Sequence, residues 1–184
     1  MALKYAGIEV EHREIALRDK PASMLLVSPK GTVPVLCVDG KVIDQSLDIM
    51  HWALSKSDPH HWKRVDDKIA SDWIEKNDGS FKTLLDQYKY PNRHPELNPA
   101  DILKAVSQLM LEPMEHALQS TSYLLGNQMT WVDIAIFPFI RQFAMVSPEQ
   151  FSKLPYPAIQ QWLDQQIQSE LFNAVMKKHP TWKD

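Results

Sequence analysis

Short strand-like and helix-like runs of apolar residues alternate over residues 1–56. Strict alternation of apolar and polar residues is typical of a strand with one face in water, whereas apolar residues three and four positions apart are typical of a helix. Two apolar runs flank Asp39-Gly40, a dipeptide that strongly favours a tight hairpin turn. The predicted elements are a strand, a helix, two strands and a helix, over residues 8–15, 22–27, 33–38, 41–43 and 46–54. This order predicts an α/β unit with a mixed sheet.

Helical spacing dominates the rest of the chain. An apolar stripe that starts at Val65 should bend at Asn77-Asp78-Gly79, where helix-forming residues are interrupted. A loop over residues 89–99 should follow, and Asn98 should cap the next helix. Pro113 lies inside that helix pattern and should kink or end it, because proline donates no backbone hydrogen bond.

The run over residues 130–145 is the most informative helical segment. Thr130 and Asp133 have the spacing of a capping box, in which two end residues satisfy each other's backbone groups. The residues that follow are apolar on nearly all sides, which predicts a central, buried helix with an internal kink at Pro138. One more amphipathic helix is expected over residues 159–167.

Composition and charge narrow the class of protein. The 184 residues are 44 % hydrophobic and 23 % charged with a net charge of −3, as is usual for a globular domain or two small ones. No basic stripe indicates a nucleic-acid partner, and no apolar run approaches the roughly 20 residues of a membrane span. Cys37 is the single cysteine, so no internal disulfide exists and a cytoplasmic location is expected. Because Cys37 falls inside a predicted strand, we expect a buried structural thiol.

Two short stretches carry candidate binding chemistry. Pro34 either starts a strand in the trans form, or forms a cis bond that turns the N–H and C=O of Val33 outward to pair with a bound peptide. Asp44 or Ser46 either caps the helix that follows, or Gln45 and Ser46 bind a carboxylate together with free backbone N–H groups at the helix start. Together, the binding interpretations suit a small peptide that has an α-carboxylate.

Two segments resemble one known family. Residues 28–54, SPKGTVPVLCVDGKVIDQSLDIMHWAL, resemble the second half of the thioredoxin-like domain of the glutathione S-transferase superfamily, in its omega-like, two-domain glutaredoxin-like branch. Residues 126–143, GNQMTWVDIAIFPFIRQF, resemble the capped core helix of that family's helical domain. The resemblance implies a fold of α/β plus all-α class: a truncated thioredoxin-like domain over residues 1–56, then an all-helical domain over residues 64–184.

The resemblance also implies a glutathione-binding set. Val33 would pair through its main chain with the cysteinyl part of glutathione, and Pro34 would be the family's cis proline. Gln45 and Ser46 would hold the γ-glutamyl group. Lys20 matches a lysine that contacts the glycyl carboxylate in the omega-like branch, although a plain surface lysine explains Lys20 as well.

The family's first strand and the turn with its catalytic Ser, Tyr or Cys have no counterpart after Met1, so the catalytic residue is unknown from this sequence. Either the natural protein begins upstream, which the intact motifs favour, or the shortened domain is rearranged. The implied activity is a transferase that uses glutathione as cosubstrate with a small electrophile or disulfide, in a homodimer. The alternative is a non-catalytic scaffold or interaction module of the same fold.

Two other clusters have simpler structural explanations. His60-His61 lacks partner ligands, so a polar linker is favoured over a metal site, and no metal is expected. A basic and aromatic cluster follows the predicted bend, and it either lines a second-substrate pocket or places cations and packed rings at a helix end. Its members are Lys82, Tyr88, Lys89, Tyr90 and Arg93.

Overall fold

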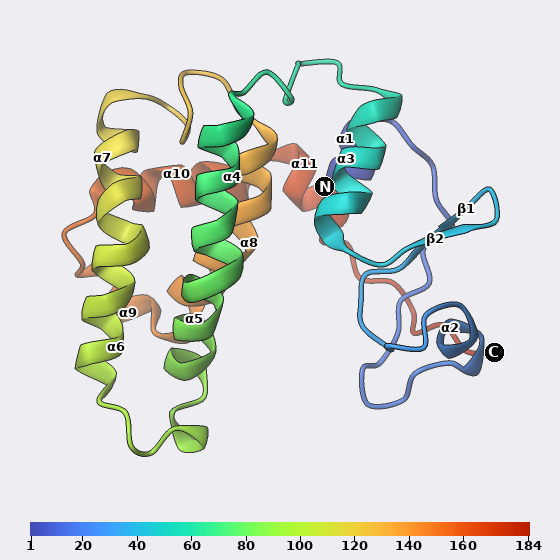
Figure 1. Cartoon of the computed structure of the whole chain (residues 1–184), viewed down its shortest axis with the longest axis horizontal. Coiled ribbons are helices and arrows are strands. Elements are labelled where there is room, and N and C mark those ends of the chain that lie inside the picture. The colour runs from blue at the N-terminus through green and yellow to red at the C-terminus, as the bar shows by residue number, and fades with distance from the viewer. The chain divides into compact units, whose positions relative to one another are not determined.

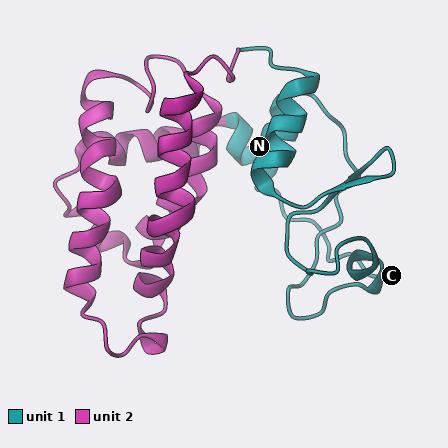
Figure 2. Cartoon of the chain, viewed as in Figure 1, with its two compact units in different colours: residues 1–60, 170–184 teal, residues 61–169 magenta.

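The computed structural model describes all 184 residues (Figure 1). The chain forms two compact units, which are coloured separately in Figure 2. Unit 1 comprises residues 1–60 and 170–184, and unit 2 comprises residues 61–169. Residues 170–184 lie with unit 1 because their helix packs against the first helix of the chain.

Unit 1 contains four helices and one small sheet. Its core is formed where the first helix packs on α3, whose inward side chains Ile49, Met50, Ala53 and Leu54 are buried. The elements of unit 1 are α1 (Ala2–Tyr5), α2 (Ala22–Val27), β1 (Leu36–Val38), β2 (Lys41–Ile43), α3 (Ser46–Lys56) and α11 (Glu170–Val175).

The predicted hairpin is confirmed. Strands β1 and β2 pair antiparallel, with Leu36 opposite Ile43, and the turn residues Asp39 and Gly40 both have positive φ angles of 49° and 72°. Positive φ at both turn positions matches the right-handed twist of the two strands, and this is why Asp-Gly suits the turn. The expected burial of Cys37 was wrong: its side chain is exposed, because it points to a face of the two-stranded sheet that nothing covers.

The predicted strand over residues 8–15 was also wrong. This segment makes only a single bridge, between Glu14 and Thr181, and residues 9–14 are exposed. Alternating polarity favours a strand only where a neighbouring strand supplies hydrogen-bond partners over several residues. Here no such ladder forms.

Unit 2 is all helical. Figure 1 shows α4 with α5, and α6 with α7, as two long rods that are joined at one end by a loop, and contacts join α5 to α6 and α4 and α5 to α8. None of the helices of the protein combines the length and hydrophobicity that a membrane span requires. The α-helices of unit 2 are α4 (Asp67–Lys76), α5 (Lys82–Lys89), α6 (Pro99–Val106), α7 (Glu112–Ser120), α8 (Trp131–Val146), α9 (Pro148–Ser152) and α10 (Pro157–Gln168).

Both predicted irregularities in these rods are π-turns. Residues Asn77–Phe81 form one between α4 and α5, where the bend was expected. Residues Ser107–Leu111 form the other between α6 and α7 and end two residues before Pro113, so the helix continues past the proline after a wider turn. The expected cap is present as well, since the side chain of Asn98 accepts the N–H of Ala100 at 2.9 Å.

Helix α8 is the buried centre of unit 2, as predicted. Every residue from Trp131 to Phe137 is buried, and Thr130 and Asp133 form the capping box. Asp133 also accepts hydrogen bonds from the N–H of Leu124 at 2.9 Å and from the indole of Trp162 at 3.2 Å. The helix start is therefore tied both to the preceding loop and to α10.

Candidate functional site

The main chain at Val33 is available to a ligand. The Val33–Pro34 peptide bond is cis, as the binding interpretation of the sequence requires. Val33 is 48 % exposed, and neither its N–H nor its C=O is hydrogen bonded within the protein. Exposed backbone groups in an extended segment can pair with a peptide as a further strand would.

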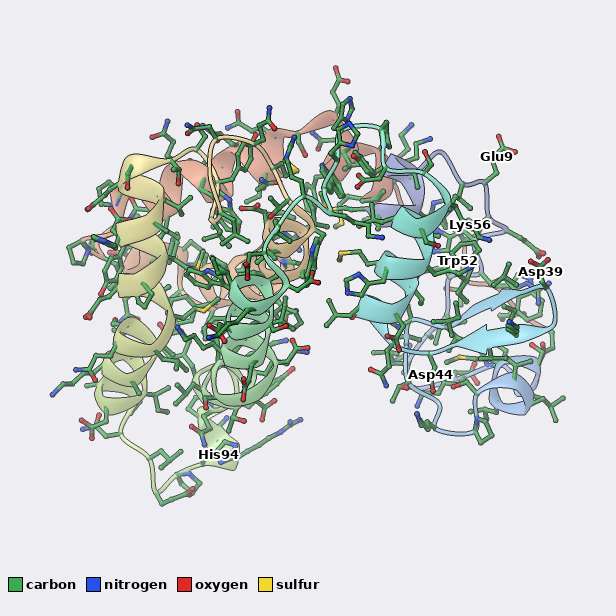
Figure 3. All side chains as sticks on the ribbon, turned by 45° about the horizontal axis from the view of Figure 1, so that its top comes forward. Glu9, Asp39, Asp44, Trp52, Lys56 and His94 are labelled. Atoms are coloured by element: carbon green, nitrogen blue, oxygen red, sulfur yellow. The ribbon has the colours of Figure 1, made fainter.

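The start of α3 has no side-chain cap. Gln45 is the residue before the helix, with φ −116° and ψ 134°, and Ser46 is the first helical residue. Both side chains are exposed, and neither bonds to the helix end. Asp44 does not cap the helix either, because its carboxylate pairs with Lys30 at 2.9 Å; Figure 3 shows Asp44 between β2 and α3. The first N–H groups of α3 are thus free to bind an anion.

The hairpin register relates these two segments. Leu36 and Ile43 are the last paired residues at the open end of the hairpin. Pro34 lies two residues before Leu36 and Gln45 lies two residues after Ile43, so both leave the hairpin at the same end. The sequence places them about ten residues apart, and the antiparallel pairing returns them to one side of unit 1.

Lys20 packs against the turn that precedes this site. Its side chain lies beside Gly31: a β-carbon there would lie 3.4 Å from Lys20 Nζ and 3.2 Å from Leu25 Cδ2. Gly31 also has φ +62°, a conformation that favours glycine. The neighbouring Lys30 pairs with Asp44, so the turn that holds Lys20 is joined to the residue before Gln45.

No catalytic role is assigned to any of the five candidate residues. Cys37 has an exposed thiol, but it lies in the middle of β1 opposite Val42, in the paired part of the hairpin. The sequence did not predict the Lys30–Asp44 ion pair or the role of Gly31. For the role of Gly31, the one local signal was the presence of a glycine in the turn over residues 29–32.

The basic and aromatic cluster of unit 2 is held by its own neighbours. Lys82 pairs with Asp78 at 2.9 Å and lies over the Phe139 ring at 4.5 Å. The Tyr88 hydroxyl donates to Gln150 at 2.9 Å, and burial raises the pKa of Tyr88. These contacts favour the structural explanation of the cluster over a substrate pocket.

Two further features bear on binding. No three His, Cys, Asp or Glu side chains come together in a way that could hold a metal ion. A hollow of about 280 Å³ lies between α7, the loop that follows it and α10, and none of the five candidate residues lines it. Its lining is mainly neutral and polar, with Gln119, Ser120, Thr121, Ser122, Asn127, Gln161 and Gln165.

Comparison with known families matches both units. A model of the glutathione S-transferase N-terminal domain matches residues 1–61, and a model of the C-terminal domain of the same family matches residues 106–165. The chain belongs to the glutathione S-transferase superfamily. As a member, it has the fold expected of one: a small thioredoxin-like N-terminal domain with a two-stranded sheet, followed by a helical domain.

The sequence identity to individual relatives in the superfamily is low. It is 26 % identical to glutathione S-transferase U19 of Arabidopsis thaliana, over 98 % of the chain and 82 % of that protein. It is 25 % identical to glutathione S-transferase 3 of Caenorhabditis elegans over 71 % of the chain, and the match spans 66 % of that protein. A solved glutathione transferase family member from Pseudomonas fluorescens, with two glutathione bound, matches with a TM-score of 0.77 and 17 % identity, over 94 % of this chain and 84 % of that one. The structural likeness concerns the fold.

Proposed function

We propose that the protein binds glutathione on unit 1 and acts as a glutathione transferase. The proposed binding residues are Lys20, Val33, Pro34, Gln45 and Ser46. The proposal rests on two features that lie at the same end of the hairpin. The main chain at Val33 is exposed and makes no hydrogen bond within the protein, and the start of α3 has no side-chain cap. Family membership adds support, because structural relatives were solved with glutathione bound.

The main chain of Val33 suits the middle of a tripeptide. Its free N–H and C=O can form two hydrogen bonds to the cysteinyl residue, in the manner of an added strand. Such bonds depend on backbone geometry and fix the direction of the peptide. The γ-glutamyl group then extends toward Gln45 and Ser46, and the glycyl carboxylate toward Lys20.

The start of α3 suits the γ-glutamyl end. This end carries an α-carboxylate, and the free N–H groups and positive dipole of an 11-residue helix stabilise an anion. The hydroxyl of Ser46 and the amide of Gln45 add donors beside those N–H groups. Hydrogen bonds to a charged group contribute about 1.5–3 kcal/mol each, so two of them account for most of the binding of this end.

The proposed reaction is attack by the glutathione sulfur. As a thiolate, it forms a new S–C bond to a small electrophile and releases the leaving group, or it exchanges with a disulfide. The residues named here hold the tripeptide and orient its sulfur, and the group that activates the thiol is not assigned among them. Assembly as a homodimer, a cytoplasmic location and membership of the omega-like branch belong to the same proposal and rest on the family resemblance.

Calorimetric titration with glutathione tests the binding step. The double variant Gln45→Ala/Ser46→Ala should bind at least about 10-fold more weakly than the wild type, because at least one charge-assisted hydrogen bond is lost. Ser55→Ala, at the other end of α3, is the matched control and should bind like the wild type. Cysteinylglycine, which lacks the γ-glutamyl group, should bind weakly and with equal affinity to the wild type and the double variant.

Either of two results would overturn the proposal: no binding of glutathione to the wild type, or equal binding by the wild type and the double variant. A conjugation or disulfide-exchange assay then separates the two functions that share this fold. Binding with turnover supports the transferase, whereas binding without turnover favours the non-catalytic scaffold.

A further inference from the structure

Residues 177–184 lie along residues 12–23 of the same unit, a segment in which no residue is fully buried. The N–H of Trp182 donates to the C=O of Glu14 at 2.7 Å, and Thr181 and Glu14 form a single parallel bridge. This is the one strand-like contact that Glu14 makes. The main chain of residues 177–184 therefore supplies a hydrogen-bond partner for residues 8–15, whose sequence pattern predicts a strand but which form no ladder with another strand.

Side chains extend this contact in both directions. The guanidinium of Arg13 lies over the Trp182 ring at 4.5 Å, and the rings of His12 and His179 lie 4.2 Å apart. A cation over a half-buried aromatic ring contributes a modest attraction. The two contacts involve His12 and Arg13, the two residues before Glu14.

The segment ends at the start of α2. The carboxylate of Asp184 accepts the N–H of Ser23 at 3.1 Å. Hydrogen bonds from Ser23, together with the N–H of Ala22 and the charge of Arg13, hold the pKa of Asp184 below its ordinary value. Residues 177–184 therefore contact both Arg13 and Glu14 at one point and Ser23 at another.

Lys20 lies between Glu14 and Ser23 along the chain. We propose that residues 177–184 form a strap that holds residues 14–23 in place and thereby positions Lys20 beside Gly31. The strap acts on the main chain at Glu14 and at Ser23, so the intervening residues are fixed at both ends. The role of the strap in ligand binding rests on the function proposed above, whereas its effect on residues 14–23 does not.

Amide hydrogen exchange in the absence of glutathione tests the strap itself. Informative amides are those of Ser23, bonded to Asp184, and of Asp19, bonded to Ala16 O at 2.9 Å. In Trp182→Ala these amides should exchange about 5- to 30-fold faster, the factor that corresponds to losing one or two weak contacts. Lys183→Ala changes an exposed neighbour in the same segment and should leave the rates unchanged.

A second variant keeps the test decisive. Deletion of residues 177–184 should raise the same exchange rates at least as much, and the peptide KKHPTWKD, added in excess, should restore protection. Unchanged exchange at Asp19 and Ser23 in both variants overturns the strap.

Glutathione titration reports on the second half of the inference. Trp182→Ala should bind glutathione about 3- to 10-fold more weakly, because Lys20 is then no longer held in place and must be ordered on binding. Faster exchange with unchanged affinity overturns the positioning of Lys20 but leaves the strap supported. If the wild type binds no glutathione, the proposed function fails, and the exchange rates still decide the strap.

Discussion

Replacement of Asp133 should destabilise unit 2 more than any exposed carboxylate does. The buried carboxylate accepts four hydrogen bonds: from the N–H of Leu124, the N–H and hydroxyl of Thr130, and the indole of Trp162, at distances of 2.9 to 3.2 Å. Through these bonds, one side chain joins the start of α8, the loop before it and α10. Truncation to alanine leaves all four donors without their acceptor.

The expected size of the effect follows from those donors. In Asp133→Asn, the amide NH₂ must replace one of the two oxygens. If it replaces Oδ2, the Thr130 hydroxyl can turn to accept it, and the main loss is the capping bond from the Thr130 N–H, about 1 kcal/mol. If it replaces Oδ1, the Leu124 N–H and the Trp162 indole N–H both lose their acceptor. We therefore expect a loss of about 1–3 kcal/mol for Asp133→Asn, and about 3–5 kcal/mol for Asp133→Ala, as when one partner of a buried charged network is removed.

The loss should also depend on pH. Burial raises the pKa of Asp133 above its ordinary value, and the hydrogen bonds from Leu124, Thr130 and Trp162 oppose that shift. A raised pKa means that the folded protein holds the proton more tightly than the unfolded chain. The wild type therefore loses stability as the pH rises from the ordinary carboxyl value through the raised one. Asparagine does not titrate, so the gap between wild type and Asp133→Asn should be larger at the acid end of this window than at neutral pH.

Urea unfolding checks both expectations. Tryptophan fluorescence includes the signal of Trp162, which contacts Asp133, and far-ultraviolet circular dichroism follows the helices. Asp164→Asn, an exposed carboxylate on α10, is the matched control and should change the free energy of unfolding by no more than about 0.5 kcal/mol. A loss below that size for Asp133→Ala, or a gap that widens toward neutral pH, would refute the reasoning.

Two further variants probe one contact each. The carboxylate of Glu115 accepts hydrogen bonds from the N–H groups of Ala158 and Ile159, at 3.1 and 3.0 Å, and so caps α10 from another helix. Glu115→Gln should lower the free energy of unfolding in urea by about 1–2 kcal/mol. Glu112→Gln, at an exposed position, is the control and should change it little. Gly31→Ala should destabilise unit 1 by at least about 1 kcal/mol, because φ is positive and the new methyl group meets Leu25 and Lys20. In Gly7→Ala the φ of +70° is similar but no atom lies within 4 Å, so a thermal unfolding comparison isolates the contact, and equal losses would rule it out.

Local signals in the sequence predicted most of the fold. Asp39-Gly40 determined the hairpin, Asn98 the start of α6, and the Thr130–Asp133 pair the start of α8. In each case the physical cause lies within four residues, either as a φ angle that suits glycine or as a side chain that meets a free N–H. These features do not depend on what the rest of the chain does.

The failures were of the opposite kind. The alternation over residues 8–15 predicted a strand, and the position of Cys37 predicted burial, but both depend on partners elsewhere in the chain. A strand needs a neighbour for its hydrogen bonds, and a sheet face is buried only if another layer covers it. The contact between Glu14 and Trp182 spans most of the chain, and no local pattern indicates it.

The candidate site combines both kinds of information. Val33, Gln45 and Ser46 follow from local sequence and family resemblance, but their common side of unit 1 follows from the pairing of Leu36 with Ile43. The Lys30–Asp44 pair also joins the two segments, yet its side chains are 64 % and 28 % exposed, and exposed ion pairs contribute only about 0–1 kcal/mol. The geometry of the site must therefore rest on the hairpin register and on the tight packing at Gly31. Consequently, substitutions that shift either of these should weaken ligand binding more than removal of the Lys30 charge.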